Sequence, residues 1–244
     1  MNKRTIYYLP GAGGQIQTGI GQGLLDRGFD ITGRETRGEF KNLEFRQQID
    51  LVANDLQSGF WTDDAKVICN SFGAYLFLHA QAGLDPFPGH LLLLSPIVGH
   101  FVNEDRMMGF VPPRSRHLME LAASGDFPMP KKAEIHVGEQ DWQSHPDAVR
   151  RFGEATGIPV TFVPNRGHAL GKDYVGKLLD QWLWLSDHHE TADWPTDRQS
   201  CHRLHGAKPR LAVSVVGQPR RSAMREPLHP SPTGLGEQGS RFPA

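Results

Sequence analysis

Three residue types that can cooperate in nucleophilic catalysis each follow a separate apolar run in this sequence. Ser71 follows the run KVICN, Asp141 ends the tetrapeptide GEQD after EIHV, and His168 follows Gly167 after VTFV. A serine hydroxyl becomes an effective nucleophile when a base takes its proton. An imidazole is such a base near neutral pH, and a carboxylate orients it and stabilises its charged form. These three residues therefore predict acyl transfer through a covalent intermediate.

The segments around these residues alternate between strand-like and helix-like patterns. Short apolar runs predict strands at 6–9, 29–32, 66–70, 90–94, 134–137 and 160–163. Helices are predicted at 18–27, 45–60, 72–82 and 146–156, and a last one carries Val175, Leu178, Trp182 and Leu185 on one face. Such alternation is typical of a parallel sheet covered by helices on both sides. Because ligands bind at the carboxyl ends of parallel strands, Ser71, Asp141 and His168 are expected to meet at one edge.

Small residues mark two tight turns at the same predicted edge. In the pentapeptide CNSFG, Gly73 lies two positions after Ser71, which suits a sharp turn from strand to helix. The run LPGAGG at 9–14 ends the first predicted strand. Acyl transfer develops an oxyanion that needs preorganised backbone N–H donors, and turns of this kind can supply them. By itself, the pentapeptide also fits a serine that only caps the next helix.

With these motifs the chain resembles the α/β-hydrolase family, whose nucleophile elbow reads G-x-S-x-G and whose triad follows the order Ser, Asp, His. Cys69 stands where that family usually has glycine. The resemblance covers roughly residues 4–187, in segments equivalent to six of the family's usual eight strands, and the opening hairpin of larger members is missing. It implies an α/β-hydrolase-like three-layer sandwich with a mostly parallel sheet of about six strands.

The resemblance also implies a role for each site residue. Ser71 is the expected nucleophile, His168 the base and then the acid, and Asp141 the group that orients His168. The backbone N–H groups of Ala12 and Phe72 are the expected oxyanion hole. The turn around Ala12 is similar to the LP-x-AGG turn of thioesterase-like members, so the substrate is expected to be a small-molecule ester or thioester. No metal or organic cofactor is expected.

Two other function classes remain open. The turn GAGG followed by Arg34 and Arg37 resembles the start of an NADP-binding short-chain reductase, in which the arginines would meet a 2′-phosphate. That reading lacks the third glycine of the fingerprint and a Tyr-x-x-x-Lys pair, since Lys177 follows Tyr174 at the wrong spacing. Alternatively, Cys69 could strain the elbow and leave a catalytically inactive hydrolase fold that binds a partner or small ligand.

Two further groups of residues carry weaker signals. Cys69 is a poor candidate for a thiol nucleophile, because it lies inside a predicted buried strand. A zinc site is a minor alternative, because the spacings fit no structural site, and its ligands would be His188, His189, Cys201, His202 and His205.

The stretch 98–132 interrupts the alternation of strands and helices. It holds four of the six methionines and the pair Pro112–Pro113. An insertion of this length is commonly functional or mobile. It is expected to be either a small cap over the site or a helix packed on the sheet edge.

Charge divides the 244 residues into two parts. The net charge of −1 combines residues 1–190, with 18 Lys+Arg and 23 Asp+Glu, with residues 191–244, with 8 Lys+Arg and 4 Asp+Glu. The second part holds 7 of the 18 prolines. We therefore expect a hydrolase domain at 1–190 and a basic, proline-rich, disordered tail at 191–244.

The whole composition excludes several other classes of protein. The near-neutral charge argues against a nucleic-acid surface, and no apolar run is long enough for a membrane span. The start MNKRTIYYLP has no signal-peptide pattern, and two cysteines cannot form a disulfide framework. A cytoplasmic location is the expectation, and nothing in the sequence indicates the oligomeric state.

Overall fold

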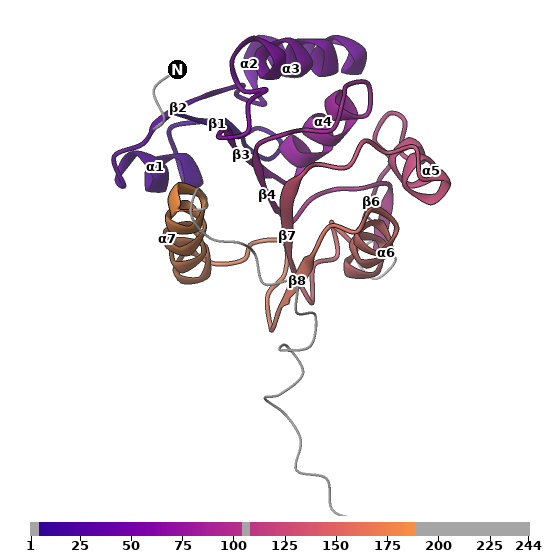
Figure 1. Cartoon of the computed structure of the whole chain (residues 1–244). Helices are drawn as coiled ribbons and strands as arrows, with labels where there is room; N and C mark the ends of the chain where they lie inside the picture. The colour runs from indigo at the N-terminus through magenta and orange to yellow at the C-terminus, as the bar shows by residue number, and fades with distance from the viewer. Residues whose placement is uncertain (1–4, 104–107, 189–244) are drawn as a thin grey trace, which may run out of the picture. The chain divides into compact units, whose positions relative to one another are not determined.

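A computed structural model describes residues 5–103 and 108–188, and its centre is a parallel sheet (Figure 1). The sheet has six strands in the order β2-β1-β3-β4-β7-β8, and every neighbouring pair is parallel. Its strands are β1 (Thr5–Leu9), β2 (Asp30–Gly33), β3 (Lys66–Asn70), β4 (His90–Leu94), β7 (Lys132–Gly138) and β8 (Val160–Val163). A separate antiparallel pair joins β5 (Phe101–Asn103) to β6 (Met108–Phe110).

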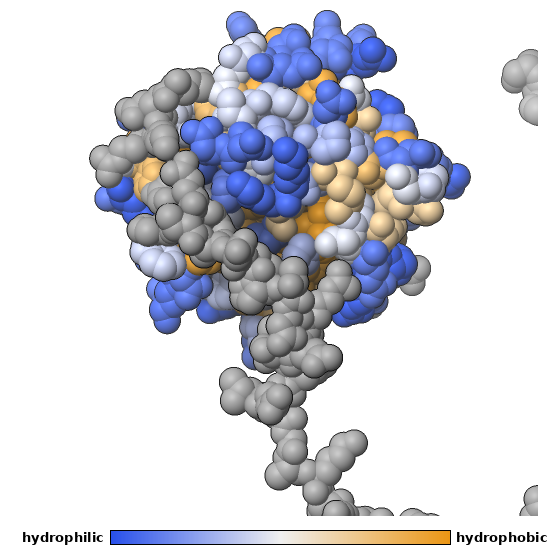
Figure 2. Space-filling model, in the orientation of Figure 1, coloured by the Kyte–Doolittle hydropathy of each residue, from blue (hydrophilic) through white to orange (hydrophobic). Residues whose placement is uncertain are grey.

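Helices cover both faces of the sheet. One core cluster joins α1 and α7 to one face, and a second joins α3, α4, α5 and α6 to the other (Figure 1). The helices are α1 (Ile20–Leu25), α2 (Gly38–Asn42), α3 (Phe45–Gly59), α4 (Phe72–Gln81), α5 (His117–Ser124), α6 (Pro146–Thr156) and α7 (Lys172–His188). Figure 2 shows that hydrophilic side chains cover much of one outer face, with apolar residues in smaller areas between them.

Strand β1 shows how one sequence serves both layers of helices. Its Ile6 and Tyr8 side chains belong to the core under α1 and α7, whereas Tyr7 and Leu9 belong to the core under α3 and α4. Successive side chains of a strand point to opposite faces, so a strand buried on both faces reads as an uninterrupted apolar run. The predicted three-layer arrangement and its six-stranded sheet are thereby confirmed.

The strand register brings the ends that precede the site residues to one edge of the sheet. Leu9 of β1 pairs with Cys69 of β3, and Asn70 pairs with Leu94 of β4. Gly138 of β7 pairs with Val163 of β8. The loops that follow these strands therefore emerge side by side, and they carry the glycine turn, Ser71, Asp141 and His168.

Several elements differ from the sequence-based expectation. Helix α1 is shorter than the predicted 18–27 and begins after Gly19, whose φ of 55° lies outside the helical region. Strand β7 begins two residues before the predicted start at 134, and the short helix α2 was not predicted. The interrupted stretch 98–132 contains the β5–β6 hairpin and α5, and α5 buries Leu118 and Ala122 in the core.

Other expectations fall on parts of the chain that the structure does not cover. The tail 191–244, and with it four of the five residues of the zinc alternative, lies outside the described residues. Within residues 5–103 and 108–188, no group of three or more His, Cys, Asp or Glu side chains is placed to hold a metal ion. A search of the same residues finds no helix with the length and apolar character needed to cross a bilayer.

His79 of α4 is a buried histidine that makes stability depend on pH. Its side chain is only 3% exposed, and neither ring nitrogen has a hydrogen-bond partner among the described residues. Burial, together with the positive charge of Arg114 and the nearby His117, lowers the pKa of His79 to about 3. The unfolded chain binds this proton near pH 6.5, so the folded state loses stability as pH falls from about 6.5 toward 3.

Replacement of His79 by phenylalanine is expected to flatten this pH dependence. The wild-type protein should lose on the order of 2 kcal/mol more than the variant between pH 7 and pH 4.5, because only the wild type must keep the ring neutral. Urea unfolding at several pH values measures the difference. The matched control is His100→Phe at an exposed position, which should keep the wild-type slope. This account would be contradicted if the free energy of unfolding fell equally with pH in the wild type and in His79→Phe.

Candidate active site

Ser71 lies at the sharp turn between β3 and α4. Its backbone has φ 53° and ψ −116°, a region that residues other than glycine rarely adopt. The turn is held because the Ser71 N–H donates to the Leu94 carbonyl at 2.9 Å. A non-glycine residue kept in such a conformation is characteristic of functional sites, because the surrounding fold must compensate for the strain.

Gly73 permits the close approach that this turn requires. A Cβ atom at this position would overlap the backbone carbonyl oxygens of Leu9 and Pro10. Those oxygens belong to the end of β1 and the glycine turn, so they cannot move away without disturbing the sheet. Gly73 thus allows α4 to start directly against the first strand.

We expect Gly73→Ala to destabilise the protein by about 1–3 kcal/mol, because the added methyl group displaces backbone rather than a flexible side chain. Urea unfolding followed by circular dichroism measures the change. Gly83→Ala is the matched control, since a Cβ atom there would lie 3.8 Å from its nearest neighbour, the Ala80 oxygen. Equal unfolding midpoints for the two variants would rule out the proposed crowding.

Cys69 occupies the elbow position where glycine was expected by resemblance, and it fits into the core. Its side chain is fully buried and belongs to the cluster that also contains Leu9 and Leu93, its partners on the neighbouring strands. Burial raises the pKa of the Cys69 thiol well above its ordinary value. The thiol therefore packs as a small apolar group and stays protonated near neutral pH.

The structure brings the side chains of Ser71, His168 and Asp141 together. The Ser71 Oγ lies 2.8 Å from His168 Nε2, and His168 Nδ1 lies 3.0 Å from each carboxylate oxygen of Asp141. A neutral imidazole with its proton on Nδ1 satisfies both contacts, because Nδ1–H donates to the carboxylate and Nε2 accepts from the hydroxyl. The arrangement suits transfer of a proton from Ser71 to His168.

Asp141 is a buried carboxylate with a full set of donors. None of its side chain is exposed, and its Oδ1 accepts from the N–H groups of Gln143 at 2.9 Å and Ser144 at 3.0 Å. Burial alone would raise its pKa, but the hydrogen bond and charge of His168 and the two backbone donors outweigh burial, so the pKa of Asp141 lies below its ordinary value. Asp141 is therefore ionised near neutral pH, as an orienting group for an imidazole must be.

Two buried serines that the sequence-based analysis missed connect the loops of the site. Ser144 Oγ donates to the Ser95 carbonyl at 2.6 Å, and Ser95 Oγ donates to the His168 carbonyl at 2.9 Å. Ser95 directly follows β4 and has a φ of 43°, and the position of a polar residue after the run HLLLL was the available signal. These bonds hold the ends of β4, β7 and β8 in a fixed relation.

The glycine turn after β1 lies against the elbow. A Cβ atom at Gly11 would approach the Ser71 Cβ to 3.2 Å. Thr36, also missed from sequence, fixes the turn, because the Gly13 N–H donates to its carbonyl and the Gly14 N–H to its hydroxyl, both at 3.0 Å. Ala12 lies at the exposed side of this turn. Phe72 is the first residue of α4.

The two arginines of the reductase alternative already have carboxylate partners. Arg34 makes a bidentate ion pair with Asp55, with both nitrogen–oxygen distances at 2.6 Å. Arg37 pairs with Glu35 at 2.7 Å. A 2′-phosphate at this position would have to compete with these carboxylates, which weakens the reductase interpretation.

The 98–132 insertion contacts the site as well as the core. The ring of Phe110 on β6 packs edge to face with that of Phe72, with centroids 6.4 Å apart. Phe101 on β5 packs in the same manner on Trp142, the residue after Asp141, at 5.6 Å. The hairpin therefore lies beside both the elbow and the Asp141 loop, while α5 packs on the core.

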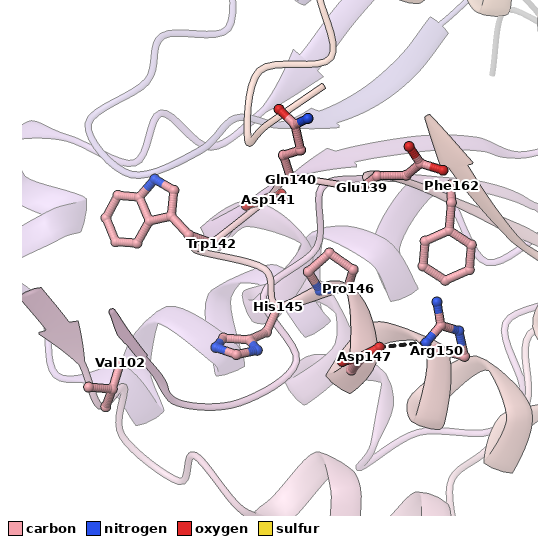
Figure 3. Close-up of a pocket in the computed structure, with 10 residues that line it drawn as sticks. All are labelled: Val102, Glu139, Gln140, Asp141, Trp142, His145, Pro146, Asp147, Arg150 and Phe162. Atoms are coloured by element: carbon pink, nitrogen blue, oxygen red, sulfur yellow. Dashed lines mark hydrogen bonds and ion pairs between the residues drawn. The ribbon is translucent and has the colours of Figure 1, made fainter. Parts of the chain in front are cut away.

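A hollow of about 710 Å³ opens beside the Asp141 loop (Figure 3). Its polar wall includes Arg150, which pairs with Asp147 and lies 4.6 Å above the centre of the Phe162 ring. Asp141 belongs to its lining, but Ser71 and His168 do not. A second hollow, of about 650 Å³, has His168 in its wall. Of these two hollows, the second is therefore the one that reaches His168.

Comparison with known proteins identifies the fold. No protein-family model and no curated protein matches the sequence. Est1E from Butyrivibrio proteoclasticus is similar at 14% identity and a TM-score of 0.53, over 75% of this chain and 88% of that chain. A Xanthomonas campestris pv. campestris protein assigned to the alpha/beta superfamily of hydrolases is similar at 14% identity and a TM-score of 0.52, over 77% of this chain and 99% of that chain.

A third similar structure is a carboxylesterase of the ammonia-oxidizing thaumarchaeon Nitrososphaera gargenis, at 13% identity and a TM-score of 0.50, over 76% of this chain and 92% of that chain. At such identities, similarity establishes the fold and leaves the reaction to be argued from the site.

Proposed function

We propose that this chain, which has the α/β-hydrolase fold, is a serine hydrolase that cleaves a small-molecule ester or thioester. The observation that carries the proposal is the continuous hydrogen-bonded series from Ser71 Oγ through His168 to the buried Asp141 carboxylate. A serine hydroxyl, an imidazole and a carboxylate in this order form the general arrangement for acyl transfer. Within the chain, we assign the catalytic domain to residues 1–190, with the β5–β6 hairpin of the stretch 98–132 as a small cap.

In the proposed acylation step, Ser71 Oγ attacks the substrate carbonyl carbon while its proton moves to His168 Nε2. The carbonyl oxygen becomes an oxyanion that accepts hydrogen bonds from the N–H groups of Ala12 and Phe72. The tetrahedral intermediate collapses, the bond to the leaving oxygen or sulfur breaks, and that atom takes the proton from His168. The product of this step is an acyl ester on Ser71.

Deacylation repeats the same chemistry with water. A water molecule gives a proton to His168 Nε2 as its oxygen attacks the acyl carbon, and the second tetrahedral intermediate expels Ser71 Oγ, which takes the proton back. The Asp141 carboxylate favours the positively charged imidazole in both steps, because it is buried and 3.0 Å from Nδ1. Each oxyanion donor is expected to contribute about 10²- to 10³-fold to kcat.

A fluorophosphonate probe tests this assignment directly. Such a probe reacts with an activated serine and becomes covalently attached to it, so we expect one adduct per folded chain, located on Ser71 by peptide mass spectrometry. Protein unfolded in urea is the control and should not react, because the serine then has no base. The absence of an adduct on Ser71 in the folded protein would favour the inactive binding protein instead.

A further inference from the structure

A groove between α1 and α7 runs up to His168. It has a volume of about 650 Å³, within the range of small-molecule sites. One wall comes from α1, the other from α7, and the groove also reaches Asn70 and Leu94, the last residues of β3 and β4. Its apolar lining consists mainly of Ile20, Leu94, Leu170, Val175 and Leu179.

The reactive end of the groove is formed by His168 and Asn70. Asn70 directly precedes Ser71, and His168 Nε2 lies 2.8 Å from the Ser71 Oγ. The His168 side chain is 22% exposed, so a molecule in the groove can touch it. The groove therefore begins within reach of the group that holds the proton after Ser71 attacks.

Proton transfer indicates which part of a substrate belongs there. In acylation the proton on His168 Nε2 must pass to the leaving oxygen or sulfur, so that atom has to lie on the His168 side of the nucleophile. The substituent on that atom then extends away from Ser71 past His168. We infer that the α1–α7 groove binds an aliphatic chain on the alcohol or thiol part of the substrate. This inference rests on the proposed serine hydrolase function.

The charges in the groove favour an uncharged chain. Arg27, two residues after the end of α1, has a guanidinium that donates to Asp180 at 2.7 Å, to the Gly23 carbonyl at 2.7 Å and to the Gly176 carbonyl at 3.0 Å. The other charged lining residues, Asp26 and Lys172, are exposed to solvent. A cation with a carboxylate and two carbonyl partners gains little from an anionic ligand. Between these polar residues, the aliphatic side chains of the lining stabilise an alkyl chain by removing it from water.

Two helical glycines leave space in this groove. A Cβ atom at Gly23 would lie 3.5 Å from Arg27 Nη1, and one at Gly176 would lie 3.7 Å from Arg27 Nη2, with no backbone contact for either. A side chain at Gly176 therefore starts without overlapping backbone, beside the Arg27 guanidinium and on the groove side of α7. Alanine at the same position adds a single methyl group and provides a graded comparison.

The test compares two ester series by kcat/KM, which reports acylation. Ethyl, butyl and hexyl acetate differ only in the leaving alcohol, and p-nitrophenyl acetate, butyrate and hexanoate differ only in the acyl chain. For the wild type we expect hexyl acetate to exceed ethyl acetate by roughly 10- to 100-fold. Gly176→Leu should reduce this ratio by about 10-fold or more, and Gly176→Ala by less, because the leucine side chain occupies the space of the alkyl chain.

The matched control is Gly83→Leu, at an exposed glycine outside the groove, and it should keep the wild-type ratio. Melting temperatures of all variants check that each one is folded. In the p-nitrophenyl series, Gly176→Leu should leave the ratio of hexanoate to acetate as in the wild type. If Gly176→Leu changes that ratio but leaves the ratio of hexyl acetate to ethyl acetate unaltered, the groove binds the acyl chain and the inference is overturned.

The remaining outcomes separate this inference from the proposed function. If Ser71→Ala hydrolyses both series as well as the wild type, the serine hydrolase proposal fails. If Ser71 is required but Gly176→Leu changes neither ratio, the groove assignment alone is wrong. If a fluorophosphonate labels Ser71 but no alkyl acetate is hydrolysed, the inference of an aliphatic leaving group is wrong. The assignment of Ser71 as the nucleophile would still stand.

Discussion

Replacement of Ser71 by alanine is expected to lower kcat for p-nitrophenyl butyrate by about 10⁵- to 10⁶-fold. Without the hydroxyl, no acyl-enzyme forms, and His168 can only assist water from a position arranged for Ser71. The fold should remain intact, because the hydrogen bond of the hydroxyl to His168 Nε2 lies within the site and alanine keeps the Cβ atom in the same turn. Release of p-nitrophenolate measures turnover, and thermal unfolding measures stability.

A matched serine-to-alanine change distinguishes loss of the nucleophile from a general effect. Ser58 lies on the exposed side of α3 and donates only to the Asn54 carbonyl of its own helix. We expect Ser58→Ala to retain wild-type turnover and to unfold within a few degrees of the wild type. Wild-type turnover by Ser71→Ala would refute the role of Ser71 outright.

Replacement of Asp141 by asparagine should reduce kcat by about 10⁴-fold. Asparagine has nearly the same size, so the backbone donors of Gln143 and Ser144 can still be met by its oxygen. Asparagine, however, has no negative charge to stabilise the imidazolium. If its amide N–H faces His168, it also favours the wrong tautomer of the imidazole. The variant should therefore keep its structure, while His168 becomes a poorer base for Ser71. Circular dichroism checks the structure, and esterase assays measure the loss of activity.

The same variant has a defined effect on stability at low pH. Because the folded-state pKa of Asp141 lies below its ordinary value of 3.8, ionised Asp141 stabilises the fold above that value, and this contribution is lost as pH falls through the folded pKa. Asp141→Asn should therefore show a shallower loss of unfolding free energy below about pH 4 than the wild type. Asp126→Asn, at an exposed loop position, is the control and should retain both activity and the wild-type acid profile.

The central strands were predictable because they are buried on both faces. KVICN and HLLLL form β3 and β4 with the bounds expected from sequence, since a strand covered by helices on both sides has no polar side to interrupt it. The loops after such strands must emerge at the same edge of a parallel sheet. For this reason the sequence alone predicts that Ser71, Asp141 and His168 lie close together.

The rest of the site depends on contacts that leave no local pattern. Ser144 meets Ser95 across 49 positions, and Ser95 meets His168 across 73, so neither hydroxyl has a partner that spacing could reveal. The strands β5 and β6 have three residues each, too few for an alternating pattern to show. Helix α1 was predicted too long because the residue pattern does not reveal that Gly19 adopts a φ of 55°, outside the helical region.

The parallel topology has a consequence for how the chain folds. Adjacent parallel strands cannot be joined by a tight turn, so each pairing closes a long loop of the chain. Ser71 and His168 are 97 positions apart in the sequence, and they meet only when several such loops have closed. Folding dominated by such distant pairings is slow compared with helix formation. During refolding, helical circular dichroism should therefore recover first, and any turnover that needs both Ser71 and His168 should return with the slowest phase, when β7 and β8 have joined the sheet.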